Sequence, residues 1–173
     1  MINMTTVLIF AGGSSSRMGQ DKSTMYGGVS RIRQECLKAN ITRIITLCGS
    51  ESRRSNFEGE VWPDPKECKC LMDLILWSIN QIDGEILLIP CDAFNLTVKG
   101  ITELSKQQNC LPLDELGNRQ PLLAKISDVS MLERNAVSLT ELFAKFSTYS
   151  NQDLASQFNN FNQNSDLKNL HSQ

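Results

Sequence analysis

A short stretch near the start of the chain combines glycines, serines and two cations. It reads Gly12-Gly13-Ser14-Ser15-Ser16-Arg17-Met18-Gly19-Gln20-Asp21-Lys22. Glycines let backbone N–H groups approach an anion closely, serine hydroxyls add donors, and Arg17 and Lys22 add positive charge. This loop therefore has the chemistry of a polyphosphate cradle. The alternative is an ordinary surface loop rich in glycine and serine.

The position of the loop favours the phosphate interpretation. It directly follows residues 5–11, a continuous apolar and β-branched run typical of a strand that is buried on both faces. Open α/β sheets bind their ligands at the carboxyl ends of such strands. Neither common phosphate motif fits, because the dinucleotide fingerprint requires G-x-G-x-x-G and the P-loop requires Lys directly after its last Gly. Here two residues separate Gly19 from Lys22.

A carboxylate follows another apolar run, where it could reach the same crevice. Asp92 comes directly after Ile89-Pro90-Cys91. We predict that Asp92 binds Mg²⁺, because this ion is usually held by one or two carboxylates together with substrate phosphate oxygens. The alternative is that Asp92 caps a helix that starts near Leu96.

Strand-like and helix-like patterns alternate along the chain. The strand-like runs are 5–11, 43–48, 85–90 and, more weakly, 122–126. The stretches with helical spacing of apolar residues are 32–39, 71–82 and 136–146. This alternation is typical of right-handed βαβ crossovers. We therefore predict an α/β fold, a Rossmann-like and mostly parallel sheet with helices on both faces.

Composition sets the class of protein that carries these motifs. A length of 173 residues with 40% hydrophobic content predicts one domain over residues 1–173. A formal net charge of -2 provides no bulk positive field for nucleic acid or an anionic membrane. The apolar run near the N-terminus is too short for a signal segment or a membrane span, so we expect a cytoplasmic protein.

The cysteines predict thiols in place of a disulfide framework or a metal centre. The chain has 6 Cys and 1 His. Without a secretion signal, these cysteines are expected to be reduced. The pair in Cys68-Lys69-Cys70, even with the distant His171, falls short of four zinc ligands at a usual spacing.

Three motifs together resemble a known family. The loop is similar to the A-G-G-x-S-x-R-M-G-x-D-K signature of nucleotidyltransferases that act on sugar nucleotides and cofactors. Ile89-Pro90-Cys91-Asp92 resembles the segment that follows a strand in the guanylyltransferases that attach GMP to molybdopterin. The ending from Phe158 to Leu167 resembles their F-x-N-[IV]-N-T-P-E-D-L motif. The chain is therefore identified as a member of the molybdenum cofactor guanylyltransferase family.

The resemblance implies a fold of the nucleotide-diphospho-sugar transferase type and transfer of GMP from GTP to molybdopterin. It implies Mg²⁺ as cofactor, and GTP or another nucleoside triphosphate, molybdopterin and proteins of molybdoenzyme maturation as partners. The expected nucleotide-binding residues are Ala11, Gly12, Gly13, Ser14, Lys22, Asp64 and Asp92. The expected catalytic residues are Arg17, Lys22 and Asp92, and Asn160 and Asn162 are expected to meet the second substrate.

Two segments depart from the family pattern. Residues 65–73 replace a P-G-P-L-A-G-like loop that contacts guanine, and 118–121 replace an R-x-H-P-like segment. Losing the glycines removes the close backbone approach on which base reading relies. CTP, another phosphorylated acceptor, or a catalytically weak nucleotide-binding accessory protein therefore remain alternatives. Asp64 matches an acidic position before the loop, or it is a turn residue beside two prolines.

The segment 159–173 gives two conflicting predictions. Its many Asn and Gln residues predict a low-complexity end that frays from the domain. The resemblance instead predicts a segment anchored by Phe158 and Phe161, with Asn160 and Asn162 facing the crevice and a short helix after them.

Overall fold

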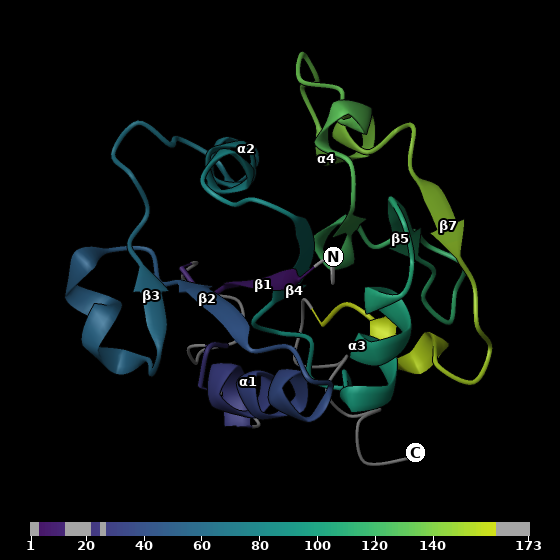
Figure 1. The fold of residues 1–173 in the computed structure, drawn as a ribbon, viewed down its shortest axis with the longest axis horizontal. Helices are drawn as coiled ribbons and strands as arrows, with labels where there is room; N and C mark the ends of the chain where they lie inside the picture. The colour runs from purple at the N-terminus through teal and green to yellow at the C-terminus, as the bar shows by residue number, and fades with distance from the viewer. Residues whose placement is uncertain (1–3, 13–21, 25–26, 162–173) are drawn as a thin grey trace.

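The computed structural model describes residues 4–12, 22–24 and 27–161, and these build one seven-stranded mixed sheet (Figure 1). The strands are β1 (Thr5–Phe10), β2 (Arg43–Leu47), β3 (Glu60–Trp62), β4 (Glu85–Pro90), β5 (Cys110–Pro112), β6 (Lys125–Ile126) and β7 (Ser147–Tyr149). Their order is β3-β2-β1-β4-β6-β5-β7. All neighbours are parallel except β6, which runs antiparallel to both β4 and β5. The predicted mostly parallel sheet is confirmed.

Helices cover both faces of the sheet, as predicted. The α-helices are α1 (Gly28–Lys38), α2 (Leu71–Asn80), α3 (Val98–Ser105) and α4 (Leu139–Leu142). The 3₁₀ turns are η3 (Glu51–Asn56), η4 (Pro121–Leu123), η5 (Val129–Met131) and η6 (Ala155–Phe158). Helices α1 and α3 lie on one face, and α2 and α4 lie on the other (Figure 1).

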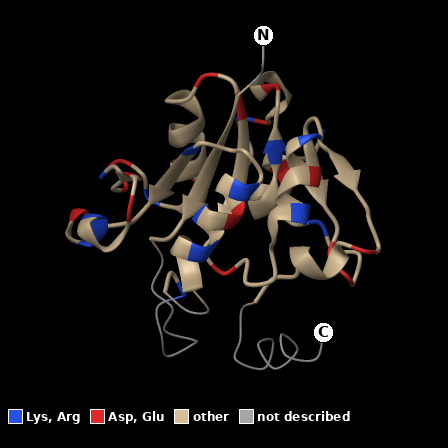
Figure 2. Cartoon of the chain, turned by 60° about the horizontal axis from the view of Figure 1, so that its bottom comes forward, with Lys and Arg blue, Asp and Glu red and all other residues tan. Residues whose placement is uncertain are grey.

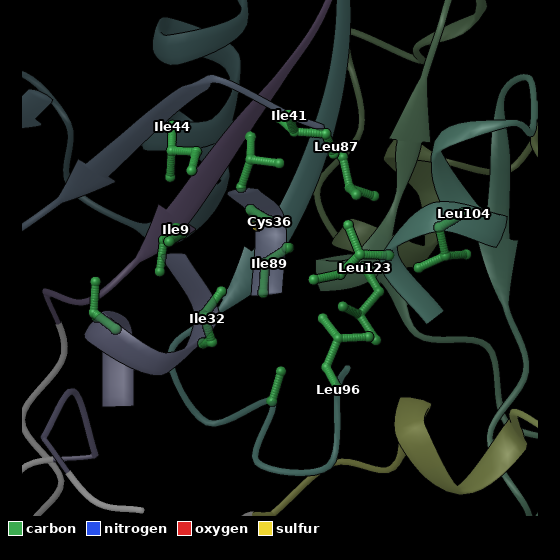
Figure 3. Packing of buried hydrophobic residues seen from close by; sticks show 14 of the residues in the cluster. Ile9, Ile32, Cys36, Ile41, Ile44, Leu87, Ile89, Leu96, Leu104 and Leu123 are labelled. Carbon is green, nitrogen blue, oxygen red and sulfur yellow. The ribbon is translucent and has the colours of Figure 1, made fainter. Parts of the chain in front are cut away.

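Alternate residues of the central strands pack into two hydrophobic cores. Val7 and Ile9 of β1 belong to the buried cluster on the side of α1 and α3, which also contains Ile32 and Leu104. Figure 3 shows Ile9, Ile32 and Leu104 of this cluster. Leu8, between Val7 and Ile9 in the sequence, points to the opposite core, with α2 and α4. Since successive side chains of a strand point to opposite faces, burial on both faces explains the continuous apolar runs in the sequence.

The strand order places a ligand crevice between β1 and β4. These strands are parallel neighbours whose carboxyl ends lie level, with Phe10 opposite Pro90. From β1 the sheet continues through β2 to β3, and from β4 it continues in the other direction through β6. Such a reversal is a topological switch point, where open α/β sheets bind ligands. Gly12 and Asp92 therefore follow the two strands into one crevice.

Three predicted elements have other bounds in the structure. The run 122–126 is a strand only at its end, because η4 occupies Pro121–Leu123 before the two-residue strand β6. The stretch 136–146 contains the four-residue helix α4, after which Phe143 and Phe146 turn into the core with ring centroids 5.0 Å apart. Helix α1 begins four residues before the predicted start at position 32.

Charged residues of both signs lie interspersed over the described helices, strands and loops (Figure 2). Among residues 4–12, 22–24 and 27–161, no helix has the length and apolar character needed to cross a membrane.

Candidate nucleotide site

A cavity of about 470 Å³ opens at the carboxyl ends of β1 and β4 and extends to the start of α2. Its lining residues are Phe10, Gly12, Lys22, Asp64, Cys68, Lys69, Cys70, Leu71, Leu74, Pro90, Cys91, Asp92 and Leu122. The predicted site residues Lys22, Asp64 and Asp92 all line this one cavity. Lys22 belongs to the glycine-rich stretch, and Asp92 follows β4. They are far apart in the sequence, and the sheet brings them together.

Lys22 and Asp92 line one part of the cavity, and together with the Phe161 carbonyl that Lys22 bonds they are here called the charged wall. The Lys22 ammonium donates to Asp92 Oδ2 at 2.8 Å and to the Phe161 carbonyl oxygen at 2.7 Å. The side chains of Lys22 and Asp92 are only 16% and 14% exposed. Because the pair is largely shielded from water, its electrostatic interaction is stronger than that of a surface pair.

The turn after Asp92 is held by helix α1. Arg31 donates its two terminal nitrogens to the carbonyl oxygens of Ala93, at 2.7 Å, and Leu96. Burial lowers the pKa of Arg31, although Glu35 opposes the shift. The helix-cap alternative for Asp92 is wrong, because α3 begins at Val98 and its flanking residue is Thr97. Asp92 instead pairs with Lys22 in the cavity.

A close backbone contact fixes the floor of the cavity. A Cβ on Gly12 would lie 2.8 Å from Gly49 Cα, and Gly49 has a positive φ of 84°. Asp64 donates its N–H to the Gly49 carbonyl at 2.7 Å and accepts the Gly49 N–H at 3.2 Å. Burial raises the pKa of Asp64. Asp64 is thus a turn-fixing residue that also lines the cavity, so its two interpretations are compatible.

Another part of the cavity lining, here called the loop wall, consists of Cys68, Lys69, Cys70 and Leu71. The Lys69 N–H donates to Asp73 Oδ2 and the Lys69 ammonium donates to the Lys66 carbonyl, each at 2.8 Å. Burial raises the pKa of the Cys68 thiol, and neighbouring carboxylates act in the same direction. In the described part of the chain, no cluster of three or more His, Cys, Asp or Glu residues is arranged to hold a metal ion.

The segment before the C-terminus is docked on α3. Gln157 Oε1 accepts from the Thr97 N–H at 3.0 Å, the Thr97 hydroxyl at 3.0 Å and the Gly100 N–H at 3.1 Å. Phe158 and Phe161 are buried, with 0% and 3% exposure. The predicted anchoring by these two rings is confirmed, and the composition-based prediction of fraying is wrong as far as Phe161.

The remaining predicted residues divide into two groups. Ala11 is buried and donates its N–H to the Leu47 carbonyl at 2.8 Å, while Asn160 is exposed on the docked segment. Gly13, Ser14, Arg17 and Asn162 lie outside the described residues. Their roles, like that of Asn160, stay predictions.

Sequence reasoning missed the residues that support the site. Gly49 follows the second strand-like run, and this position was a usable signal for a close approach. Arg31 and Gln157 are polar residues of ordinary appearance. Their partners are 62 and 65 residues away for Arg31, and 57 and 60 residues away for Gln157. No local pattern indicates such partners.

The switch-point crevice, with its paired lysine and aspartate, is the arrangement expected of a nucleotidyltransferase domain. The profile of the MobA-like NTP transferase domain matches residues 7–148. The chain therefore belongs to the family of MobA-like NTP transferase domains, and the family resemblance predicted from its motifs is confirmed.

Two cyanobacterial relatives carry a more specific name. Proteins called probable molybdenum cofactor guanylyltransferase, from Synechococcus elongatus and from a second Synechococcus strain, are each 32% identical to this chain over 116 residues. The alignment covers 62% of this chain and 60% of each relative. The chain thus matches well under two thirds of the length of these curated relatives.

Solved structures agree with the fold. A nucleotidyl transferase from Methanothermobacter thermautotroptrophicus superposes with a TM-score of 0.70 at 15% identity, covering 98% of this chain and 97% of that one. A 4-diphosphocytidyl-2C-methyl-D-erythritol synthase from Anaerococcus prevotii superposes with a TM-score of 0.60 at 10% identity, with 98% and 97% covered. The predicted fold type is confirmed.

Proposed function

We propose that this chain is a molybdenum cofactor guanylyltransferase that transfers GMP from GTP to molybdopterin and releases pyrophosphate. Family membership and the two Synechococcus relatives support the reaction class and the acceptor. The observation that carries the proposal is the cavity at the β1–β4 switch point, where Lys22 meets Asp92 beside the glycine loop. We treat residues 1–173 as one nucleotidyltransferase domain that works in the cytoplasm and delivers its product to molybdoenzyme maturation.

In the proposed reaction, a terminal phosphate oxygen of molybdopterin attacks the α-phosphorus of GTP. A bond forms between that oxygen and the α-phosphorus, and the bond to the β-phosphate bridging oxygen breaks, so pyrophosphate leaves. Such a reaction depends on positioning and on neutralising charge, and it needs no covalent intermediate. Lys22, with Arg17 and the glycine-loop amides, would hold the phosphates.

The donor set of the charged wall fits a hard divalent cation. Asp92 offers a carboxylate beside a carbonyl oxygen, and an ammonium already binds between them. Oxygen ligands of these two kinds suit Mg²⁺. Asp92 would therefore hold Mg²⁺, which, when bound, neutralises charge on the reacting phosphate. Arg31 helps to orient Asp92, because it holds the turn that follows this residue.

The loop wall supports a second candidate, a transferase for another nucleotide or acceptor. Residues 65–73 replace the glycine-containing base-reading loop of the family, and Cys68, Lys69 and Cys70 of this segment line the cavity. Side chains with thiols and an ammonium present different hydrogen-bonding groups from a glycine backbone. CTP is therefore the competing nucleotide to test.

Pyrophosphate release is the decisive assay. The protein is incubated with Mg²⁺ and each of the four common ribonucleoside triphosphates, with and without molybdopterin, and the product is identified by mass. We expect release that requires GTP, molybdopterin and Mg²⁺ together. Preference for CTP would favour the second candidate. Triphosphate binding without release in any combination would indicate an accessory protein and would contradict both.

A further inference from the structure

The Lys22 ammonium occupies the position where a cation would bind. It lies between a carboxylate oxygen of Asp92 and the carbonyl oxygen of Phe161, at 2.8 and 2.7 Å. Both side chains of the ion pair are at least five-sixths buried. Any other cation that approaches Asp92 from the cavity therefore meets a positive charge first.

The two oxygen acceptors are held from outside the cavity. The Phe161 ring packs on Phe94, with ring centroids 5.5 Å apart, and both rings are buried. Phe94 follows Asp92 by two residues, and its N–H donates to the Asp92 carbonyl at 2.8 Å. Arg31 bonds the carbonyl of the residue between them. The two oxygens thus form a positioned pair of acceptors, and the Lys22 ammonium is the group that both of them bind.

We propose that Lys22 fills the cation site of the nucleotide-free protein, so that a divalent metal enters only when a triphosphate draws the ammonium away from Asp92. Like charges close together in a shielded site repel strongly, so the ammonium and the metal exclude each other. A triphosphate offers Lys22 other anionic oxygens. Metal and nucleotide therefore bind with positive coupling, and each raises the affinity for the other by the same factor.

This inference uses the proposed function only to name the triphosphate as the ligand that moves Lys22. The exclusion of metal from the nucleotide-free protein is a separate property of the charged wall. It can be measured without nucleotide or acceptor, so its outcome does not depend on whether guanylyl transfer is the reaction.

The test measures Mn²⁺ binding to the nucleotide-free protein. Unbound Mn²⁺ is quantified by its electron paramagnetic resonance signal. Wild type is compared with Lys22→Met, which keeps a chain of similar length and loses the charge. Lys69→Met is the matched control, because it removes one positive charge from the loop wall of the same cavity. Lys22→Met/Asp92→Asn tests whether any gained affinity depends on Asp92.

We expect wild type to bind Mn²⁺ weakly. The Mn²⁺ affinity of Lys22→Met should be about tenfold higher or more, since this variant lacks the positive charge that opposes the metal. Lys69→Met should change affinity less than threefold, and the double variant should return to weak binding. Equal affinity in wild type and Lys22→Met, or a gain that survives in the double variant, would overturn the proposal. If Lys22→Met does not fold by circular dichroism, Lys22→Gln, which retains a donor for Phe161, decides by the same criteria.

Discussion

The two walls of the cavity are built in different ways. In the charged wall, Lys22 bonds partners 70 and 139 residues away in the sequence. In the loop wall, Lys69 bonds partners 3 and 4 residues away. The charged wall is therefore assembled by the tertiary fold, whereas the loop wall is assembled largely by its own short segment.

This difference explains where the sequence can vary. A change at Lys22 or Asp92 leaves a shielded charge without its partner, which is costly in a folded protein. A change in residues 68–70 alters groups that line the cavity, and the hydrogen bonds of Lys69 stay within its own segment. The motif that resembles the family is accordingly found on the charged wall, and the departure from the family is found on the loop wall.

The largest expected effect comes from Asp92→Asn. The amide keeps the shape and still accepts from Lys22, but it loses the charge that would hold a divalent metal. We expect metal-dependent turnover to fall roughly 100-fold or more, because metal charge stabilisation is worth several kcal/mol. The variant should still fold but melt at a lower temperature, because the shielded Lys22 ammonium loses its charged partner. Turnover is measured against Mg²⁺ concentration. A wild-type metal dependence in the variant would remove Asp92 from the metal site.

Lys22→Met should weaken nucleotide binding about tenfold or more, because a charge-assisted phosphate contact is worth about 1.5–3 kcal/mol. Titration calorimetry with GTP measures this change. Lys106→Met is the matched control, since Lys106 pairs with Glu103 on α3 and does not line the cavity. Equal losses in both variants would mean that the cavity is not the phosphate site.

The sequence predicted those parts of the fold that have a local signal. Strands β1, β2 and β4 are continuous apolar runs, and α2 shows a regular apolar stripe. The strands β3, β5 and β7 were not predicted because each has only three residues, too few for a periodic pattern. The antiparallel direction of β6 is set by its neighbours and leaves no local mark.

The start of α1 shows how a tertiary contact overrides propensity. Glycine is a poor helix former, and the predicted helix began at position 32, after the two glycines at 27–28. In the structure, Gly28 has a positive φ, and a Cβ there would collide with the Ser23 carbonyl. Val29 donates to that same carbonyl at 2.9 Å. The glycine permits this close approach between the start of α1 and Ser23.

Gln157→Ala tests whether the hydrogen bonds of Gln157 hold the docked segment, which carries Phe161 of the charged wall, against α3. It removes the shared acceptor of three hydrogen bonds to Thr97 and Gly100. We expect the free energy of unfolding to fall by about 1–3 kcal/mol, and the melting temperature by roughly 2–4 °C per kcal/mol. Gln152→Ala, an exposed position nearby, is the control. Equal melting of both variants would show that Gln157 contributes nothing to docking.

Asp64→Asn tests the junction between the walls through its pH dependence. Burial raises the pKa of Asp64, so the folded state binds this proton more tightly than the unfolded state. Wild-type stability contributed by this group is present below the ordinary pKa of aspartate and is lost as the pH rises through the raised pKa. Asn still accepts from Gly49 and cannot titrate. As the pH rises through this window, the urea midpoint of unfolding should fall more for wild type than for Asp64→Asn. Parallel curves for the two proteins would contradict a raised pKa of Asp64.

The smallest expected effect is that of Cys70→Ser, on the loop wall. Cys70 flanks the first residue of α2, and its side chain makes no capping hydrogen bond there. Serine is a much better residue for that position, and Asp73, three residues later, already accepts from the Lys69 N–H. We therefore expect a stability gain of up to about 1 kcal/mol by thermal melting. Because serine keeps a side chain of similar size with one donor, the GTP dissociation constant should change by less than about twofold, within about 0.4 kcal/mol.

The matched control is Cys36→Ser, which places a hydroxyl at a thiol position with 0% exposure in the core beneath α1. Burying a hydroxyl without a partner costs about 1–3 kcal/mol, so this variant should melt at a lower temperature. If Cys70→Ser raises the melting temperature and Cys36→Ser lowers it, the same chemical change is tolerated in the loop wall and is destabilising in the core. A loss of GTP affinity in Cys70→Ser would instead mean that the thiol itself contacts the nucleotide, and the loop wall would then be as tightly specified as the charged wall.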